Sequence, residues 1–142
     1  MLAAQMPADP TDARVVRSVS IVGAGMMGTA IAAANVRCDM PVVLADSDEQ
    51  VLADAPSRIA RELAGDRQVP SPETAGQVGR LVVASTDPAR IGACDLVLES
   101  IVESLAAKQQ LYSRLEPHLS PESLLASNTS TIPIARDRKS VV

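Results

Sequence analysis

The amino-acid sequence predicts an α/β domain in which a mainly parallel sheet is covered by helices on both faces. Short apolar runs alternate with longer segments of helical periodicity over residues 15–134. Of the 142 residues, 46% are hydrophobic but only 1% are aromatic, so the core must be built from Val, Leu, Ile and Ala, which suits strands buried on both faces. A G-x-G-x-x-G motif at Gly23, Gly25 and Gly28 directly follows the first apolar run. These observations together predict a doubly wound fold of Rossmann type.

The glycine motif lies between a strand expected over 15–22 and a helix expected over 27–36. Gly23 would permit the tight turn, Gly25 would let a pyrophosphate approach the backbone, and Gly28 would let the helix pack closely on the strand. The start of that helix offers free N–H groups and a positive dipole end to phosphates. The motif therefore favours a dinucleotide site over an ordinary glycine-rich turn. The candidate contacts are Gly23, Ala24, Gly25, Met26, Met27 and Gly28.

The second expected strand, over 42–45, ends in Asp46, at about the spacing of the acid that binds the ribose hydroxyls in dinucleotide-binding domains. A carboxylate there would repel a 2′-phosphate, and no arginine immediately follows it, so NAD is expected in preference to NADP. Asp48 is placed to cap a helix over 49–63. Pro56 interrupts the helical pattern and would kink that helix.

The second half of the chain continues the alternation. A surface excursion over 64–79 with a short helical piece at 73–78 precedes a strand at 81–84, a connection at 85–93, a strand at 95–99, a helix from about 101 to 115 and a strand at 123–126. The polar cluster 127–131 then follows at the carboxyl end of a strand. It would either border the ligand crevice of the sheet or cap a helix starting at Ile132, and the residues favour these two interpretations equally.

Bulk properties exclude several functions. The net charge of -4 without a basic cluster argues against a nucleic-acid partner, and no apolar run approaches the ~20 residues of a membrane span. Cys38 and Cys94 lack metal-ligand spacing, so no metal site is expected, and two free thiols indicate the cytoplasm. Residues 1–14 show no periodicity and are expected to form a flexible leader. His118 follows Pro117 in a polar turn and is expected at the surface.

Three segments carry a resemblance to a known family. They are 19–28 with the glycine motif, 95–103 with the sequence DLVLESIVE, and 125–134 with LASNTSTIPI. On these segments the chain resembles, over about 15–134, the NAD-binding domain of the 3-hydroxyacyl-CoA dehydrogenases, including the version inside multifunctional fatty-acid oxidation proteins. The resemblance implies NAD as cofactor and oxidation of an L-3-hydroxyacyl-CoA to the 3-oxoacyl-CoA.

The resemblance also assigns roles to residues. Asp46 would bind the adenosine ribose, Glu103 and Lys108 would contact the cofactor after the fourth strand, and Ser130 would place a hydroxyl near the substrate oxygen and the nicotinamide, with Asn128 beside it. The alternative for Glu103 and Lys108 is that of solvated residues in the first turn of a helix.

The chain departs from the family in its last residues. The family's catalytic histidine segment and its helical substrate and dimerisation domain have no counterpart here, and 135–142 is expected to form a charged tail. Residues 62–80 are short and mixed in charge, so few CoA contacts are expected from them. The chain alone is then expected to show at most trace activity, and to self-associate or pair with a chain that supplies the missing domain. The alternatives are a non-catalytic NAD-binding or partner-docking module, or another oxidoreductase such as a 6-phosphogluconate-type dehydrogenase, against which the 127–130 loop argues.

Overall fold

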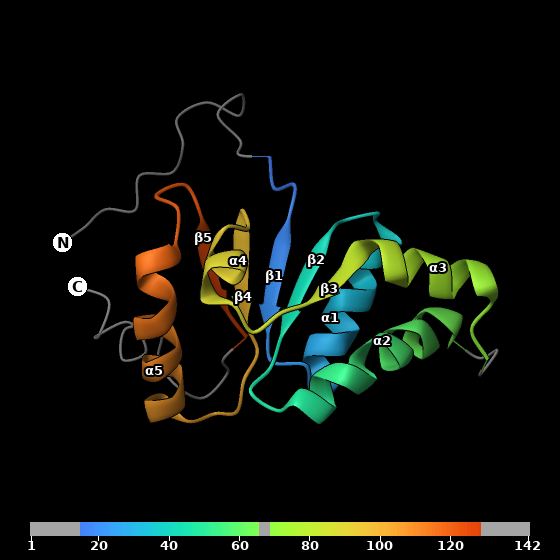
Figure 1. The fold of residues 1–142 in the computed structure, drawn as a ribbon, viewed down its shortest axis with the longest axis horizontal. Helices are drawn as coiled ribbons and strands as arrows, with labels where there is room; N and C mark the ends of the chain where they lie inside the picture. Colours follow the sequence, from blue (N-terminus) through green and yellow to red (C-terminus); the bar gives the residue numbers. More distant parts are fainter. Residues whose placement is uncertain (1–14, 66–68, 129–142) are drawn as a thin grey trace.

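Five parallel strands form the centre of the structure, and their order confirms the expected doubly wound sheet. The computed structural model describes residues 15–65 and 69–128. The expectations for the leader 1–14, for Ser130 and for the tail 135–142 fall outside these residues. The sheet runs in the order β3-β2-β1-β4-β5 and consists of β1 (Val19–Val22), β2 (Val42–Ala45), β3 (Val82–Ala84), β4 (Leu96–Glu99) and β5 (Leu124–Ser127) (Figure 1).

The path of the chain reverses beside β1. It leaves β1 in the middle of the sheet, builds β2 and β3 on one side, and then crosses back to add β4 and β5 on the other. The parallel register aligns the last residues of four strands, so that Val22 lies opposite Ala45 and Glu99, and Glu99 lies opposite Ser127. The segments that follow these strands therefore leave the sheet side by side, where such folds bind ligands.

Helices cover both faces of the sheet. Alternate residues of β1 point to opposite faces, so that Ile21 packs in a core with α1 and α2 while Val22 packs in a second core with Ile91 of α4 and Leu115 of α5. Both cores are aliphatic, as the composition predicts. The helices are α1 (Met26–Arg37), α2 (Glu49–Ala64), α3 (Pro72–Leu81), α4 (Pro88–Gly92), α5 (Leu105–Leu115) and the 3₁₀ turn η3 (Glu116–His118).

Several boundaries differ from the sequence expectations. Helix α3 occupies the second half of the expected surface excursion, because Ser71 caps it and Pro72 suits its first turn. The expected connection at 85–93 contains the short helix α4, which Asp87 caps. Helix α5 begins at Leu105 rather than near 101, since Ser104 is its cap. Helix α2 continues through Pro56.

Candidate functional site

The glycine turn packs against two neighbouring segments. Gly23 has a φ of 110°, a value that favours glycine, and a Cβ there would lie 2.2 Å from the carbonyl oxygen of Ser100. A Cβ on Gly28 would lie 1.7 Å from the carbonyl oxygen of Gly23, so α1 can approach the turn this closely only with glycine at that position. Gly25 is different, because nothing lies within 4 Å of its Cβ position. The two outer glycines thus permit packing, and the middle one faces open space.

The N-terminus of α1 has no side-chain cap. Gly25 is its N-cap residue, and no acidic residue lies in the first turn. The exposed side chains there are apolar, with Met26 83% and Met27 54% accessible. An uncapped helix start keeps its first N–H groups and its positive dipole end available to an anion. By contrast, the other four α-helices in the described part of the chain are capped by Asp48, Ser71, Asp87 and Ser104.

Asp46 joins the end of β2 to the glycine turn. Its Oδ2 accepts a hydrogen bond from the Ala24 N–H at 2.7 Å, and its Oδ1 accepts one from the Asp48 N–H at 2.9 Å. The side chain is half-buried, so its carboxylate remains in reach of a ligand. Asp48 in turn accepts hydrogen bonds from Gln50 and Val51 N–H, which confirms it as the cap of α2. The fold thus brings the expected ribose-binding acid against the expected phosphate-binding turn.

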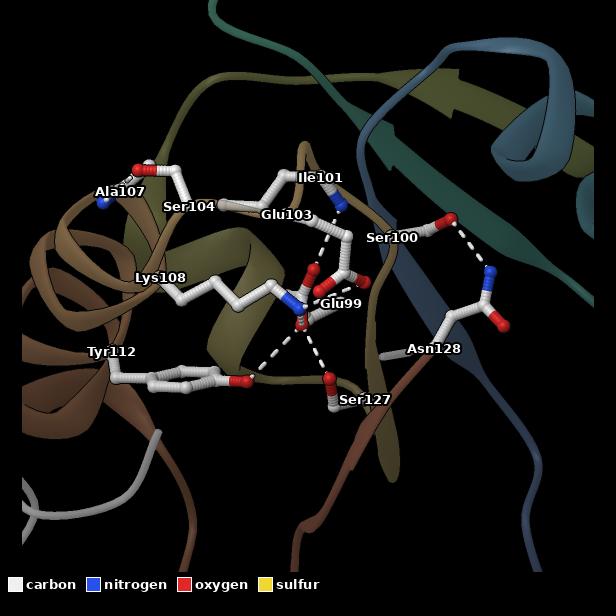
Figure 2. Close-up of polar contacts among 10 residues, drawn as sticks. All are labelled: Glu99, Ser100, Ile101, Glu103, Ser104, Ala107, Lys108, Tyr112, Ser127 and Asn128. Atoms are coloured by element: carbon white, nitrogen blue, oxygen red, sulfur yellow. Dashed lines mark hydrogen bonds and ion pairs between the residues drawn. The ribbon is translucent and has the colours of Figure 1, made fainter. Parts of the chain in front are cut away.

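A buried polar cluster lies on the other side of the glycine turn, around Glu99 at the end of β4 (Figure 2). The Glu99 side chain is 1% exposed. Its Oε2 accepts hydrogen bonds from the hydroxyls of Tyr112, at 3.2 Å, and Ser127, and lies 3.3 Å from Lys108 Nζ. Its Oε1 accepts a hydrogen bond from the Ile101 N–H at 2.8 Å. One carboxylate therefore connects β4, α5, β5 and the loop after β4, and we call these five residues the Glu99 cluster.

Glu103 and Lys108 lie together, with Lys108 inside the Glu99 cluster. Lys108 Nζ is 3.5 Å from Glu103 Oε1, and the Lys108 side chain is 0% exposed whereas that of Glu103 is 38% exposed. The interpretation of both residues as solvated helix residues is therefore wrong for Lys108. In this structure Glu103 is the member of the pair that reaches the surface, and Lys108 supports it from within.

Asn128 links the end of β5 to the loop after β4. Its backbone N–H donates to the Glu99 carbonyl at 2.8 Å, and its side-chain amide donates to the Ser100 hydroxyl at 3.3 Å (Figure 2). The side chains of Ser127 and Asn128 thus donate hydrogen bonds to Glu99 of β4 and to Ser100 of the following loop. Ser130 lies outside the described residues.

Two of the contributing residues were not assigned a role from the sequence. Glu99 ends an apolar strand, and a lone acid in such a run was the available signal for a buried charge that needs partners. Arg58 on α2 donates to the carbonyl of Ala24 in the glycine turn at 2.7 Å. The sequence carries no comparable signal for Arg58, because a charged residue on an amphipathic helix is usually solvated.

The histidine and the two cysteines of the described residues take no part in the contacts described above. His118 is exposed in η3, as expected. Cys38 is exposed and Cys94 is buried. Burial raises the pKa of the Cys94 thiol, and hydrogen bonds with Ser18 and Ser20 offset part of this increase. Within 15–65 and 69–128, no group of three or more His, Cys, Asp or Glu side chains could hold a metal ion. Over the same residues, no helix combines the length and the apolar character needed to cross a membrane.

A family model described as the NAD-binding domain of 3-hydroxyacyl-CoA dehydrogenase matches residues 18–141. The putative fatty acid oxidation complex trifunctional enzyme of Rickettsia felis is 35% identical over 126 residues, which cover 85% of this chain and 17% of that protein. The human mitochondrial hydroxyacyl-coenzyme A dehydrogenase is 30% identical over 128 residues, which cover 84% of this chain and 41% of that protein. The chain therefore spans less than half the length of either relative.

Solved structures show the same similarity. The 3-hydroxybutyryl-CoA dehydrogenase of Escherichia coli superposes with a TM-score of 0.78 at 30% identity, over 89% of this chain and 27% of that one. FadB2 of M. tuberculosis superposes with a TM-score of 0.80 at 28% identity, over 89% of this chain and 46% of that one. The lactate dehydrogenase of Cryptosporidium parvum, with a TM-score of 0.64 and 17% identity, shares the fold alone.

Proposed function

Because the chain belongs to the family of NAD-binding domains of 3-hydroxyacyl-CoA dehydrogenases, we propose that it binds NAD along the carboxyl edge of its sheet. Membership of this family also removes the alternative of an unrelated oxidoreductase. The single observation that carries the proposal is the hydrogen bond between Asp46 and the Ala24 N–H, beside the uncapped start of α1. This bond supports the proposal because the carboxylate that would bind the ribose lies next to the turn that would bind the pyrophosphate.

Each half of the cofactor has partners of suitable chemistry. The adenosine ribose would donate its hydroxyls to Asp46, and the pyrophosphate would lie over Gly25 at the start of α1, next to the exposed Met26 and Met27. The nicotinamide half would then extend toward the segments after β4 and β5. There Glu103, supported by Lys108, and the residues Asn128 and Ser130 would form its surroundings.

We propose oxidation of an L-3-hydroxyacyl-CoA as the reaction of the complete enzyme. When bound, NAD would supply an acceptor for the hydride from C3 of the substrate, and a general base would be needed for the proton of the hydroxyl. The sequence contains one histidine, His118, and it lies in η3 after the far end of α5 from the Glu99 cluster. A further segment or a partner chain would therefore supply the base and the rest of the acyl-CoA site.

The cellular location of the chain is a separate part of the proposal. Relatives carry the names of peroxisomal and mitochondrial enzymes, and the free, exposed thiol of Cys38 suits any reducing compartment. We propose the cytoplasm as the location of this chain. Fractionation of the source cells with an antibody against the chain tests it.

Calorimetric titration of the purified chain with NAD and with NADP tests the proposed function. NAD should bind more tightly, because the Asp46 carboxylate accepts both ribose hydroxyls and repels a 2′-phosphate. Absence of NAD binding would contradict the proposal as a whole. Equal affinity for both cofactors would leave the family assignment intact and remove Asp46 from its role.

A further inference from the structure

Arg58 ties α2 to the glycine turn, and none of the proposed cofactor contacts accounts for it. Its Nη2 donates to the Ala24 carbonyl at 2.7 Å and to the Val51 carbonyl at 2.8 Å. The side chain is half-buried, and Ala24 is 0% exposed. A buried carbonyl needs a hydrogen-bond donor, and here the donor comes from a side chain 34 residues away.

Ala24 is thereby held at both of its backbone groups. Asp46 accepts from its N–H at 2.7 Å, and Arg58 donates to its carbonyl. The Ala24 carbonyl belongs to the same planar trans peptide as the Gly25 N–H, and these two groups point in opposite directions. A hydrogen bond that fixes the direction of the carbonyl therefore also fixes the direction of the Gly25 N–H. Gly25 is exposed and has open space at its Cβ position, where the pyrophosphate would lie.

A second hydrogen bond, within α2, fixes the position of the Arg58 guanidinium. Its bond to the Val51 carbonyl, seven residues earlier in the chain, holds the guanidinium against its own helix. A guanidinium presents several donors in one plane, which suits simultaneous bonds to two carbonyls better than an ammonium group does.

We propose that Arg58 is a positioning residue for dinucleotide binding: it holds the Ala24–Gly25 peptide so that the Gly25 N–H is oriented toward the pyrophosphate before the cofactor arrives. The inference rests on the proposed function, because it concerns the same site. Preorganisation of this kind raises affinity by removing the cost of ordering the turn upon binding. Its effect falls on ligands that contain a pyrophosphate and not on those that contain only the nucleoside.

The test compares ADP-ribose, which contains the pyrophosphate, with adenosine, which does not. Arg58→Met should weaken ADP-ribose and NAD by about tenfold, the order expected for one hydrogen bond to a charged group, while adenosine affinity stays within about twofold. Arg58→Lys should recover part of the loss. Arg61→Met is the matched control, because Arg61 lies on the same helix, is exposed and bonds only within α2, to Ser57, in the described contacts.

Two results would overturn the inference while leaving the proposed function intact. One is wild-type NAD affinity in Arg58→Met; the other is an equal loss for ADP-ribose and adenosine, which indicates a general structural defect. Circular dichroism establishes that each variant is folded. If Arg58→Met does not fold, a folded Arg58→Gln variant decides, because its side chain is two atoms shorter than that of arginine; wild-type ADP-ribose affinity in it would refute the positioning role. Failure of the wild-type chain to bind NAD would instead refute the proposed function, and the inference with it.

Discussion

At the scale of single residues, two carboxylates with different surroundings serve different ends. Asp46 is half-buried and its partners are backbone N–H groups, which leaves lone pairs in reach of a ligand. Glu99 is almost fully buried, and its partners are three side chains of its cluster and the backbone N–H of Ile101. An acid with free lone pairs at the surface can recognise a cofactor, whereas an acid fully engaged inside can only hold the structure around it.

Replacing Asp46 with asparagine separates its charge from its hydrogen bond to the turn. Asp46→Asn keeps an oxygen for the Ala24 N–H, but it replaces the acceptor of the Asp48 N–H by an NH2 group and loses the charge-assisted bonds to the ribose, so NAD affinity should fall by about 1–2 kcal/mol. NADP should be affected less, because the repulsion of its 2′-phosphate is removed at the same time. Calorimetry measures both constants. Asp54→Asn, an exposed position on α2, is the control, and an unchanged NAD to NADP ratio in Asp46→Asn would contradict the argument.

Glu99→Gln tests the buried cluster. The substitution keeps the shape of the side chain but removes its charge. The ammonium of Lys108, which is 0% exposed, then has Glu103 as its remaining acidic partner among the ion pairs described. We expect a loss of about 3 kcal/mol in the free energy of unfolding, because breaking a buried ion pair leaves a charge poorly compensated. Urea unfolding measures it. Glu103→Gln, at a 38% exposed side chain, should cost less than about 1 kcal/mol; equal losses in the two variants would show that burial does not distinguish the two acids.

At the scale of elements, the sequence predicts what periodicity can reveal. The strands and helix α2 were expected close to their observed positions from their apolar patterns, and α1 from its place after the glycine motif, whereas α5 was expected about four residues too early. Helix α4 was not expected, because five residues are too few to show a helical period. The first apolar run starts at 15, yet β1 starts at Val19, because the pairing with β2 and β4 limits the strand to four residues.

The contacts of the candidate site also differ in how far the sequence predicts them. The proximity of Asp46 to the glycine turn was predictable because their spacing along the chain is short and fixed. The roles of Glu99 and Arg58 were not, because their partners lie on other elements, as far as 34 residues away for Arg58 and Ala24. Contacts of this kind depend on how the helices pack on the sheet, and a local sequence pattern does not determine that packing.

Two glycines of the same motif offer a matched test of packing against binding. Gly28→Ala should destabilise the fold by about 1–3 kcal/mol, because its Cβ would lie 1.7 Å from the Gly23 carbonyl oxygen and the backbone must shift. Gly25→Ala should leave stability nearly unchanged, since its φ is -70° and its Cβ position is open, yet weaken NAD binding by occupying the space for the pyrophosphate. Thermal unfolding and calorimetry measure the two effects. Full NAD affinity in a folded Gly25→Ala variant would place the pyrophosphate elsewhere.

At the scale of the whole molecule, the topology gathers the site. The parallel register brings the ends of β2, β1, β4 and β5 level, so that residues as distant in the chain as Asp46 and Asn128 leave the same edge of the sheet (Figure 1). Helix α5 leads from Ser104, beside that edge, to η3, which contains His118. The same arrangement that assembles a cofactor site thus carries the chain's one histidine away from it.

This separation predicts that cofactor binding and catalysis can be uncoupled in the purified chain. With NAD bound, oxidation of a 3-hydroxyacyl-CoA should proceed at a trace rate at most, because a general base contributes about 10²–10⁴ in rate and substrate positioning by further structure contributes more. NADH formation followed at saturating NAD measures it, and His118→Ala is the control. That variant should leave any residual rate unchanged, since an exposed side chain beyond the far end of α5 cannot reach the hydroxyl of a substrate beside Glu103. Turnover at a rate usual for a dehydrogenase would show that the residues of this chain alone provide a base, and a loss of that rate in His118→Ala would identify it.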